Sequence, residues 1–168
     1  EEIIPLIRET FGDDMALYAD ANGDYDVKEA IRVGRLLEEY NYRYFEEPVF
    51  FDWLDGTKQV ADALSIPVAG GEQQHSIHAF RWLLANDGLD VVQPDHYYFG
   101  GIIRSLKAAR MGHAMGKKCI PHLSGGFGFI YMLHLVSAMP NAGEHIEFKG
   151  YTNIPLECES SSLRVEHG

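Results

Sequence analysis

The sequence predicts an α/β fold in which parallel strands alternate with helices. Short apolar runs recur along the chain, and several lack the polar–apolar alternation of a half-exposed strand. Such runs are typical of parallel strands that are covered on both faces. The segments between them carry apolar residues at helical spacing. Alternating strands and helices predict a parallel sheet, which could be an open sheet or a closed (β/α) barrel.

The expected strands are six short runs that share an apolar core, namely 16–19, 43–45, 66–69, 91–93, 118–121 and 145–148. A helix is expected before the first strand, because Ile4, Ile7 and Phe11 follow helical spacing. The other helices with a clear apolar stripe are expected over 27–40, 102–109 and 129–136. Asp26 precedes the first of these stripes and is a good N-cap residue.

Composition bounds the class of protein. The chain has 168 residues, of which 46% are hydrophobic, and we treat residues 1–168 as one domain. Its net charge of −11 argues against nucleic acid or an anionic membrane surface as the main partner. No run of 18 apolar residues occurs. The two cysteines, Cys119 and Cys158, do not form a disulfide framework, so a cytoplasmic location is expected.

Both ends of the sequence indicate a piece of a longer chain. It opens with Glu1-Glu2-Ile3-Ile4, without an initiator Met, a basic segment or a signal-like apolar segment. It closes on residues 160–168, which are typical of a turn that leads into a further strand. We therefore expect additional sequence on either side.

One ionisable residue stands at the end of each expected strand: Asp20, Glu46, Glu72, Asp95, His122 and Glu147. The gaps between them are 23 to 27 residues, so each βα unit contributes one such group. In a closed barrel the carboxyl ends of the strands form a ring, and these side chains would converge on one pocket. In an open, doubly wound sheet they would spread along an edge. The nearly constant spacing favours the barrel.

Three carboxylates that converge on one point repel each other, unless some are protonated or a cation lies among them. Oxygen ligands without Cys or His favour a hard cation, Mg²⁺ before Ca²⁺ or Mn²⁺. The alternative is that each acidic residue is merely solvated or caps the next helix. The matched spacing of all three favours the cation site.

Asp95 and His122 are expected on adjacent strand ends, where a carboxylate could orient an imidazole as a general base. Glu147 on the last strand would face the same pocket and, if protonated, could donate a hydrogen bond to a developing oxyanion. The remaining histidines are interpreted as structural, because none of them has this place in the spacing: His75, His78, His96, His113, His134, His145 and His167.

Six short strings, in this order and at these distances, resemble the enolase superfamily. They are Asp20-Ala21-Asn22, Phe45-Glu46-Glu47-Pro48, Gly70-Gly71-Glu72, Gln93-Pro94-Asp95 followed by Gly100-Gly101-Ile102, Pro121-His122, and His145-Ile146-Glu147. The resemblance covers about residues 1–150. It is to the mandelate racemase/muconate lactonizing enzyme subgroup, within its racemase and acid-sugar dehydratase branch. It implies a partial TIM-type barrel of about six βα units, without the capping domain and the first strands.

The resemblance also implies roles for the strand-end residues. Asp20, Glu46 and Glu72 would bind Mg²⁺; Glu46 is preferred to Glu47, because the family's ligand precedes an acidic residue and then Pro. Asp95 and His122 would form the catalytic dyad, with Glu147 as the electrophilic acid. Together these residues would remove the α-proton of a carboxylate substrate through an ene-diolate intermediate.

The reaction that the resemblance implies is dehydration of a sugar acid to a 2-keto-3-deoxy acid. A racemase or epimerase of the same family, or a metal-binding barrel fragment without turnover, are the alternatives. The family's opposite-face Lys would lie upstream of Glu1, and Lys117, Lys118 and Lys149 do not replace it. The implied partner is a small carboxylate substrate rather than nucleic acid or membrane, and the full-length form is expected to be a homo-oligomer.

Overall fold

The structure, a computed structural model, describes residues 2–123, 125–126 and 128–148. Within them, five parallel strands form one sheet: β1 (Tyr18–Asp20), β2 (Tyr44–Glu46), β3 (Val68–Gly70), β4 (Val91–Val92) and β5 (Lys118–Cys119). The helices are α1 (Ile3–Phe11), α2 (Val27–Glu39), α3 (Leu54–Ala63), α4 (Ile77–Ala85), α5 (Ile102–Ala114) and α6 (Gly128–Ala138). The α/β class predicted from the sequence is confirmed.

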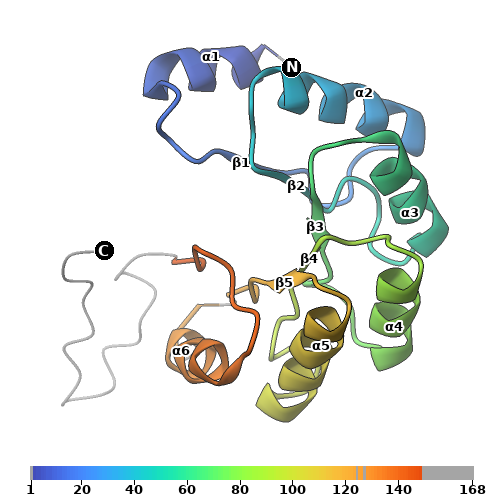
Figure 1. Cartoon of the computed structure of the whole chain (residues 1–168), viewed down its shortest axis with the longest axis vertical. Helices are drawn as coiled ribbons and strands as arrows, with labels where there is room; N and C mark the ends of the chain where they lie inside the picture. The colour runs from blue at the N-terminus through green and yellow to red at the C-terminus, as the bar shows by residue number, and fades with distance from the viewer. Residues whose placement is uncertain (1, 124, 127, 149–168) are drawn as a thin grey trace.

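The strand order decides between the open sheet and the barrel. The strands lie side by side in the order of the sequence, β1-β2-β3-β4-β5, and every pairing is parallel. A doubly wound sheet reverses its order at a switch point, whereas a (β/α) barrel adds each strand next to the previous one. Figure 1 shows the helices following one another around the outside of the strands. The described chain is therefore an arc of a (β/α) barrel.

One expected strand is not formed. Residues 145–148 have no strand assignment, so the described arc has five strands rather than six. Cys119 of β5 instead pairs with residues 141–143, which precede the expected strand. Its N–H donates to the Asn141 carbonyl, and its carbonyl accepts from the Gly143 N–H. That pairing is a single bridge between Cys119 and Ala142. The two-residue β5 offers no longer ladder, and a strand without a ladder of hydrogen bonds is not stabilised.

Local sequence explains why the helices form where they do. The Asp26 side chain accepts a hydrogen bond from the Glu29 N–H at 2.8 Å and so caps α2, as predicted. The buried face of α2 includes Ala30, Val33 and Leu37, which belong to the core cluster that also contains the interior of β2 and β3. Burial of this apolar stripe fixes the helix against the outside of the sheet.

A buried arginine joins the N-terminal helix to the barrel. Arg8 is 7% exposed, and its guanidinium donates to four main-chain carbonyl oxygens. The acceptors are Gly12 and Met15 in the loop before β1, and Tyr40 and Asn41 in the loop before β2. Charged hydrogen bonds in a buried setting are strong, because the carbonyls have no water to replace the donor. No periodicity signal in the sequence indicates this role.

Replacing Arg8 with Met should lower the free energy of unfolding by about 3 kcal/mol, because four main-chain carbonyls lose the charged donor that a buried Arg8 supplies. Urea denaturation followed by circular dichroism measures the change. The free energy of unfolding of Arg8→Lys should lie between those of the wild type and the Met variant, since an ammonium reaches fewer of these acceptors. A loss below about 1 kcal/mol for the Met variant would show that water satisfies the carbonyls.

Two further sequence expectations concern the cysteines and the membrane. Cys119 is a free, fully buried thiol in β5, and burial raises its pKa to about 12. Cys158 lies outside the described residues. Over the part of the chain that is described, no helix is both long and apolar enough to span a bilayer.

Candidate active site

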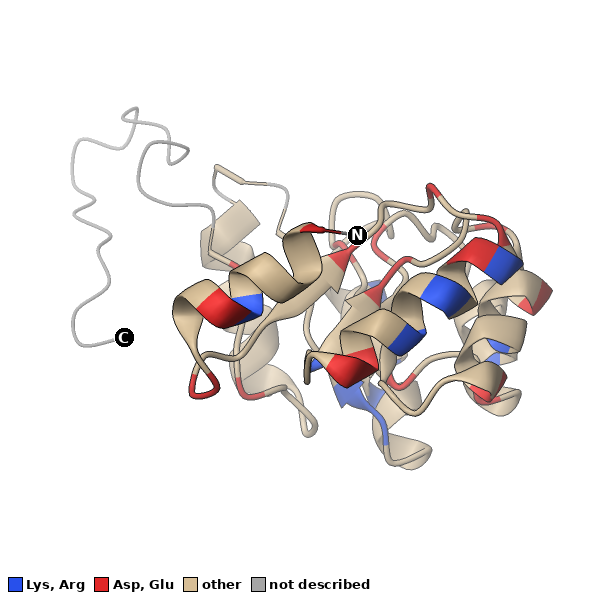
Figure 2. Cartoon of the chain, turned by 90° about the horizontal axis from the view of Figure 1, so that it is seen from above, with Lys and Arg blue, Asp and Glu red and all other residues tan. Residues whose placement is uncertain are grey.

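The strands deliver the predicted ionisable residues to one end of the arc. Asp20 and Glu46 are the last residues of β1 and β2, and they are direct partners in the parallel register. The ends of these two strands are drawn in red as acidic positions in Figure 2. Glu72, Asp95 and His122 each follow the next strands by two or three residues. Parallel strands place their carboxyl ends on one edge, so these side chains share that edge.

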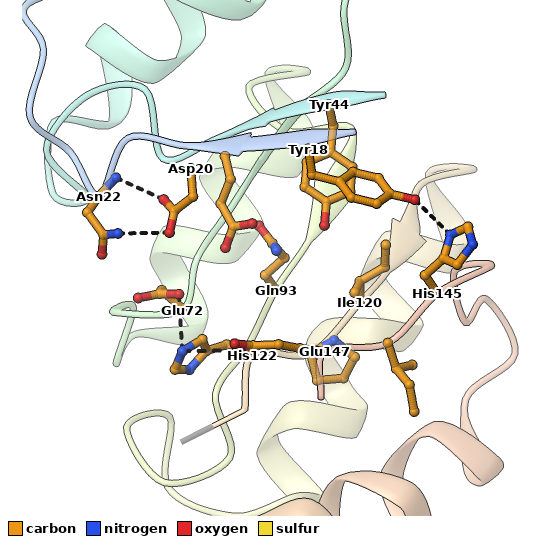
Figure 3. A pocket seen from close by; sticks show the side chains of 13 residues that line it. Tyr18, Asp20, Asn22, Tyr44, Glu72, Gln93, Ile120, His122, His145 and Glu147 are labelled. Atoms are coloured by element: carbon orange, nitrogen blue, oxygen red, sulfur yellow. Dashed lines mark hydrogen bonds and ion pairs between the residues drawn. The ribbon is translucent and has the colours of Figure 1, made fainter. Parts of the chain in front are cut away.

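A pocket of about 500 Å³ lies at this edge. Five of the six predicted site residues line it: Asp20, Glu46, Glu72, His122 and Glu147. The sixth, Asp95, lies beneath it as the fully buried partner of His122. The structure therefore brings all six into one place. Figure 3 shows Asp20, Glu72, His122 and Glu147 with their side chains around the same space.

Each of the three carboxylates proposed as metal ligands is held by a neighbour. Asp20 accepts two hydrogen bonds from Asn22, one from the backbone N–H and one from Nδ2, both at 2.8 Å. The Glu46 carboxylate accepts from the Gln93 side chain. Glu72 Oε2 lies 3.4 Å from His122 Nε2. Asn22 and Gln93 therefore fix the directions of the Asp20 and Glu46 carboxylates, and Glu72 lies beside the imidazole of His122.

The three carboxylates share the pocket without sharing one coordination point. Across residues 2–123, 125–126 and 128–148, no three His, Cys, Asp or Glu side chains form a group that could hold a metal ion. The chemistry of the donor set nevertheless fits a hard divalent cation, since three carboxylates face one polar space. Binding would require the three carboxylates to turn toward one another, which their remaining lone pairs allow while they still accept hydrogen bonds.

Charge repulsion at the site is visible in Glu46. Burial raises the pKa of its carboxyl to about 7, and the negative charges of Asp20, Glu72 and Glu47 add to the rise. The hydrogen bond from Gln93 opposes it. The neighbouring Glu47 has its pKa raised to about 7 as well, mainly by burial and then by Glu72. The site thus concentrates more negative charge than its own donors neutralise.

The imidazole of His122 is oriented by Asp95. His122 Nδ1 lies 2.7 Å from Asp95 Oδ2, and the other oxygen, Oδ1, accepts from the backbone N–H groups of Tyr97 and Tyr98. Because a carboxylate can only accept, Nδ1 is the donor in this pair. Asp95 is held by three donors, so it fixes both the ring plane and the tautomer of His122. Nε2 is then the ring atom that faces the pocket.

Glu147 reaches the same imidazole from the far side. Its Oε2 lies 3.9 Å from His122 Nε2 and accepts from the Leu123 N–H at 2.7 Å. The side chain is about a third exposed, at 35%. It therefore stands between the imidazole and open solvent. The segment that carries it is not a strand, yet Glu147 reaches the position that a strand end would give it.

Several pocket residues were not predicted from the sequence. Gln93 is 3% exposed and donates to Glu46, although the spacing argument singled out only the Asp two positions later. Asn22 has φ of +48° and donates two hydrogen bonds to Asp20. Its place two residues after a strand-end carboxylate is the signal that could have found it.

An aromatic pair and a histidine form another wall of the pocket. Tyr18 and Tyr44 are register partners with ring centroids 4.3 Å apart, and both line the pocket. Tyr18 Oη lies 2.7 Å from His145 Nδ1. The sequence interpretation treated His145 as structural, whereas the structure places it in the pocket lining. Residues two before a strand-end ligand share its face of the strand, which is how Tyr18 and Tyr44 could have been predicted.

The three residues after Glu72 lie outside the pocket lining. Gln73 donates to Glu47 at 3.0 Å. Gln74 is buried and donates to the Phe51 carbonyl. His75 is exposed, and its carbonyl accepts from Arg104. The loop after β3 thus directs only Glu72 into the pocket.

Fold and site together define part of a (β/α) barrel with an acid-and-imidazole centre at its strand ends. Over residues 1–168 the chain matches the family model described as Enolase C-terminal domain-like, and it belongs to that family. It is thus a member of the enolase superfamily, and its relatives place it in the mandelate racemase/muconate lactonizing enzyme subgroup.

Known relatives agree with this membership. The chain is 37% identical over 139 residues to arabinonate dehydratase of Saccharolobus solfataricus, covering 82% of this chain and 37% of that protein. It is 37% identical over 163 residues to L-talarate/galactarate dehydratase of Salmonella typhimurium, covering 96% of this chain and 39% of that protein. The chain therefore spans less than half the length of these relatives.

A solved structure extends the likeness to three dimensions. It is the mandelate racemase/muconate lactonizing protein from Paracoccus denitrificans PD1222, complexed with magnesium. The TM-score is 0.80 at 35% sequence identity, and the match covers 85% of this chain and 39% of that chain. The partial-barrel fold predicted from the sequence is therefore confirmed.

Proposed function

We propose that this chain is the catalytic barrel portion of a magnesium-dependent enzyme that removes the α-proton of a hydroxy-carboxylate. The most specific form of the proposal is dehydration of a sugar acid to a 2-keto-3-deoxy acid. The observation that carries it is the imidazole of His122, fixed by Asp95 at 2.7 Å in the pocket that three carboxylates also line. Residues 1–168 are proposed to act as one domain.

His122 is proposed as the general base. With Nδ1–H donated to Asp95, Nε2 is the atom that can take a proton from substrate in the pocket. Asp95 stabilises the imidazolium that forms, because its buried carboxylate stays next to Nδ1. After the α-proton moves to Nε2, the Cβ–O bond breaks as the Cα–Cβ double bond forms, and the leaving hydroxyl takes a proton from the His122 imidazolium to depart as water. The resulting enol takes a proton from solvent at Cβ and becomes the 2-keto-3-deoxy acid.

Asp20, Glu46 and Glu72 are proposed to hold the Mg²⁺ ion. When bound, a divalent cation neutralises the charge that develops on the substrate carboxylate as the α-proton leaves. Glu147, whose carboxylate lies near the same His122 Nε2 atom as that of Glu72, is proposed to place its carboxyl group next to the same developing charge. If it is protonated there, it can donate a hydrogen bond.

The pocket lining favours a hydroxylated acid as substrate. Besides the ionisable groups, it presents Asn22, Gln93 and the Tyr18 hydroxyl, each of which can bond to a hydroxyl group. The relatives that are dehydratases of arabinonate and of talarate or galactarate support dehydration. A racemase or epimerase remains the alternative, supported by the likeness to the mandelate racemase/muconate lactonizing protein. We also propose that the enzyme is a cytoplasmic homo-oligomer and that neither nucleic acid nor a membrane is its partner.

The test is turnover by the native protein that contains this chain. It is incubated with a panel of aldonates and Mg²⁺ in D₂O, and 2-keto-3-deoxy acid is measured. Formation of that product supports the dehydratase. Deuterium incorporation at the α-carbon without a keto product supports the racemase. Binding of Mg²⁺ with neither reaction, across the panel, would support the inert metal-binding fragment.

A further inference from the structure

Glu47, next to the proposed ligand Glu46, is turned away from the pocket. It is 4% exposed and lines a small cavity behind the site, together with Thr57, Gly71 and Gln74. Two adjacent carboxylates at one strand end therefore face opposite ways: Glu46 faces the pocket and Glu47 the interior. Burial of a carboxylate is costly unless hydrogen bonds or a charged partner compensate for the lost water, so the contacts of Glu47 need an account.

The contacts of Glu47 reach the loops that carry the other two carboxylates. Its carbonyl accepts from the Gly23 N–H at 2.8 Å, in the loop that follows Asp20. Its own N–H donates to the Ala69 carbonyl of β3 at 3.0 Å. Its side-chain Oε2 accepts from Gln73 Nε2 at 3.0 Å, and Gln73 directly follows Glu72. One residue therefore joins the ends of β1, β2 and β3.

The backbone at Glu47 supports a specific role for its side chain. Its φ of +38° lies in the left-handed region, which costs energy for a residue other than Gly, Asn or Asp. A glycine would make this turn without strain. The observed side chain, in contrast, supplies the hydrogen bond to Gln73. The strain is therefore accompanied by a contact that a glycine could not make.

We propose that Glu47 is a positioning residue for the acidic site. Its carboxylate holds Gln73, and so fixes the loop after β3 in the direction that brings Glu72 to the pocket beside Glu46. The part of this inference that concerns cation binding rests on the proposed function. Its effect on the loop does not.

The experiment compares three variants of the full chain. Gln73→Ala removes the hydrogen bond without changing any charge. Glu47→Ala removes the carboxylate, and Glu47→Gln keeps an oxygen that accepts from Gln73. Asn86→Ala is the matched control, because Asn86 also donates one side-chain amide bond, to the Trp82 carbonyl at the end of α4. Two readouts are taken: Mg²⁺ affinity by calorimetry, and amide hydrogen exchange over residues 71–74 without metal.

Gln73→Ala and Glu47→Ala should each speed exchange over residues 71–74 and weaken Mg²⁺ binding roughly 10-fold. Glu47→Gln should restore slow exchange and most of the affinity, and the control should match the wild type. Unchanged exchange in both Ala variants would overturn the inference. So would a loss of affinity in Glu47→Gln with none in Gln73→Ala, because Glu47 would then be a direct ligand. Faster exchange in the two Ala variants, together with no Mg²⁺ binding by the wild type, would uphold the positioning role and refute the proposed function.

Discussion

His122→Asn will abolish removal of the substrate α-proton while leaving the protein folded. The imidazole Nε2 is the pocket-facing atom that we assign as base, and the amide of Asn cannot accept a proton in its place. General-base catalysis contributes about 10²- to 10⁴-fold to a rate, so kcat should fall by roughly that factor. The measurement is deuterium exchange at the α-carbon in D₂O, together with product formation, in the native protein.

The control measurement for this prediction is the Mg²⁺ affinity of the same variant. Mg²⁺ affinity of His122→Asn should stay within about threefold of wild type, because an oriented base, unlike a ligand or its support, leaves metal affinity largely intact. Asp95→Asn should also lose most of the rate, since an amide in place of the carboxylate no longer fixes Nδ1–H as the donor. If His122→Asn keeps its exchange rate, another group removes the proton and the dyad is structural.

Asp20→Asn, Glu46→Gln and Glu72→Gln should each weaken Mg²⁺ binding by at least tenfold, because each removes one anionic oxygen ligand. Calorimetric titration of the chain with Mg²⁺ measures the change. Glu46→Gln should not lower thermal stability, since it relieves repulsion from Asp20 and Glu72 at a half-buried position. A loss of affinity in that variant is then not a consequence of unfolding.

The matched control for the three carboxylates is Asp62→Asn. Asp62 pairs with Lys58 on the surface of α3, away from the pocket lining, and its variant loses the same charge. Its affinity should equal that of the wild type. Equal affinity in all four variants would contradict the assignment of the three carboxylates, because Mg²⁺ would then bind elsewhere.

The regular spacing in the sequence was sufficient to predict the framework of the site. Asp20 and Glu46 are register partners, and His122 meets Asp95, because each βα unit places its strand end at the same edge. The helix over 27–39 with its Asp26 cap was predictable for a local reason: the cap and the stripe lie within a few residues.

The contacts that refine the site were not predictable in the same way. Three hydrogen bonds of the site join residues that are 26 or more positions apart in the sequence, and they depend on side-chain direction. The pairs are Gln93 with Glu46, Gln73 with Glu47, and His145 with Tyr18. The prediction of a sixth strand was wrong for a related reason. Residues 145–148 have the composition of a strand, but strand formation depends on a paired neighbour, and β5 offers only a bridge at Cys119.

The most direct test of the central claim is a crystal structure of the chain grown with Mg²⁺, with Mn²⁺ soaked in for anomalous scattering. We predict one ion with a carboxylate oxygen of Asp20, Glu46 and Glu72 each at about 2.1 Å, the length of a Mg²⁺–oxygen bond. An ion bound at other residues, or no ion among these three carboxylates at saturating metal, would contradict the claim.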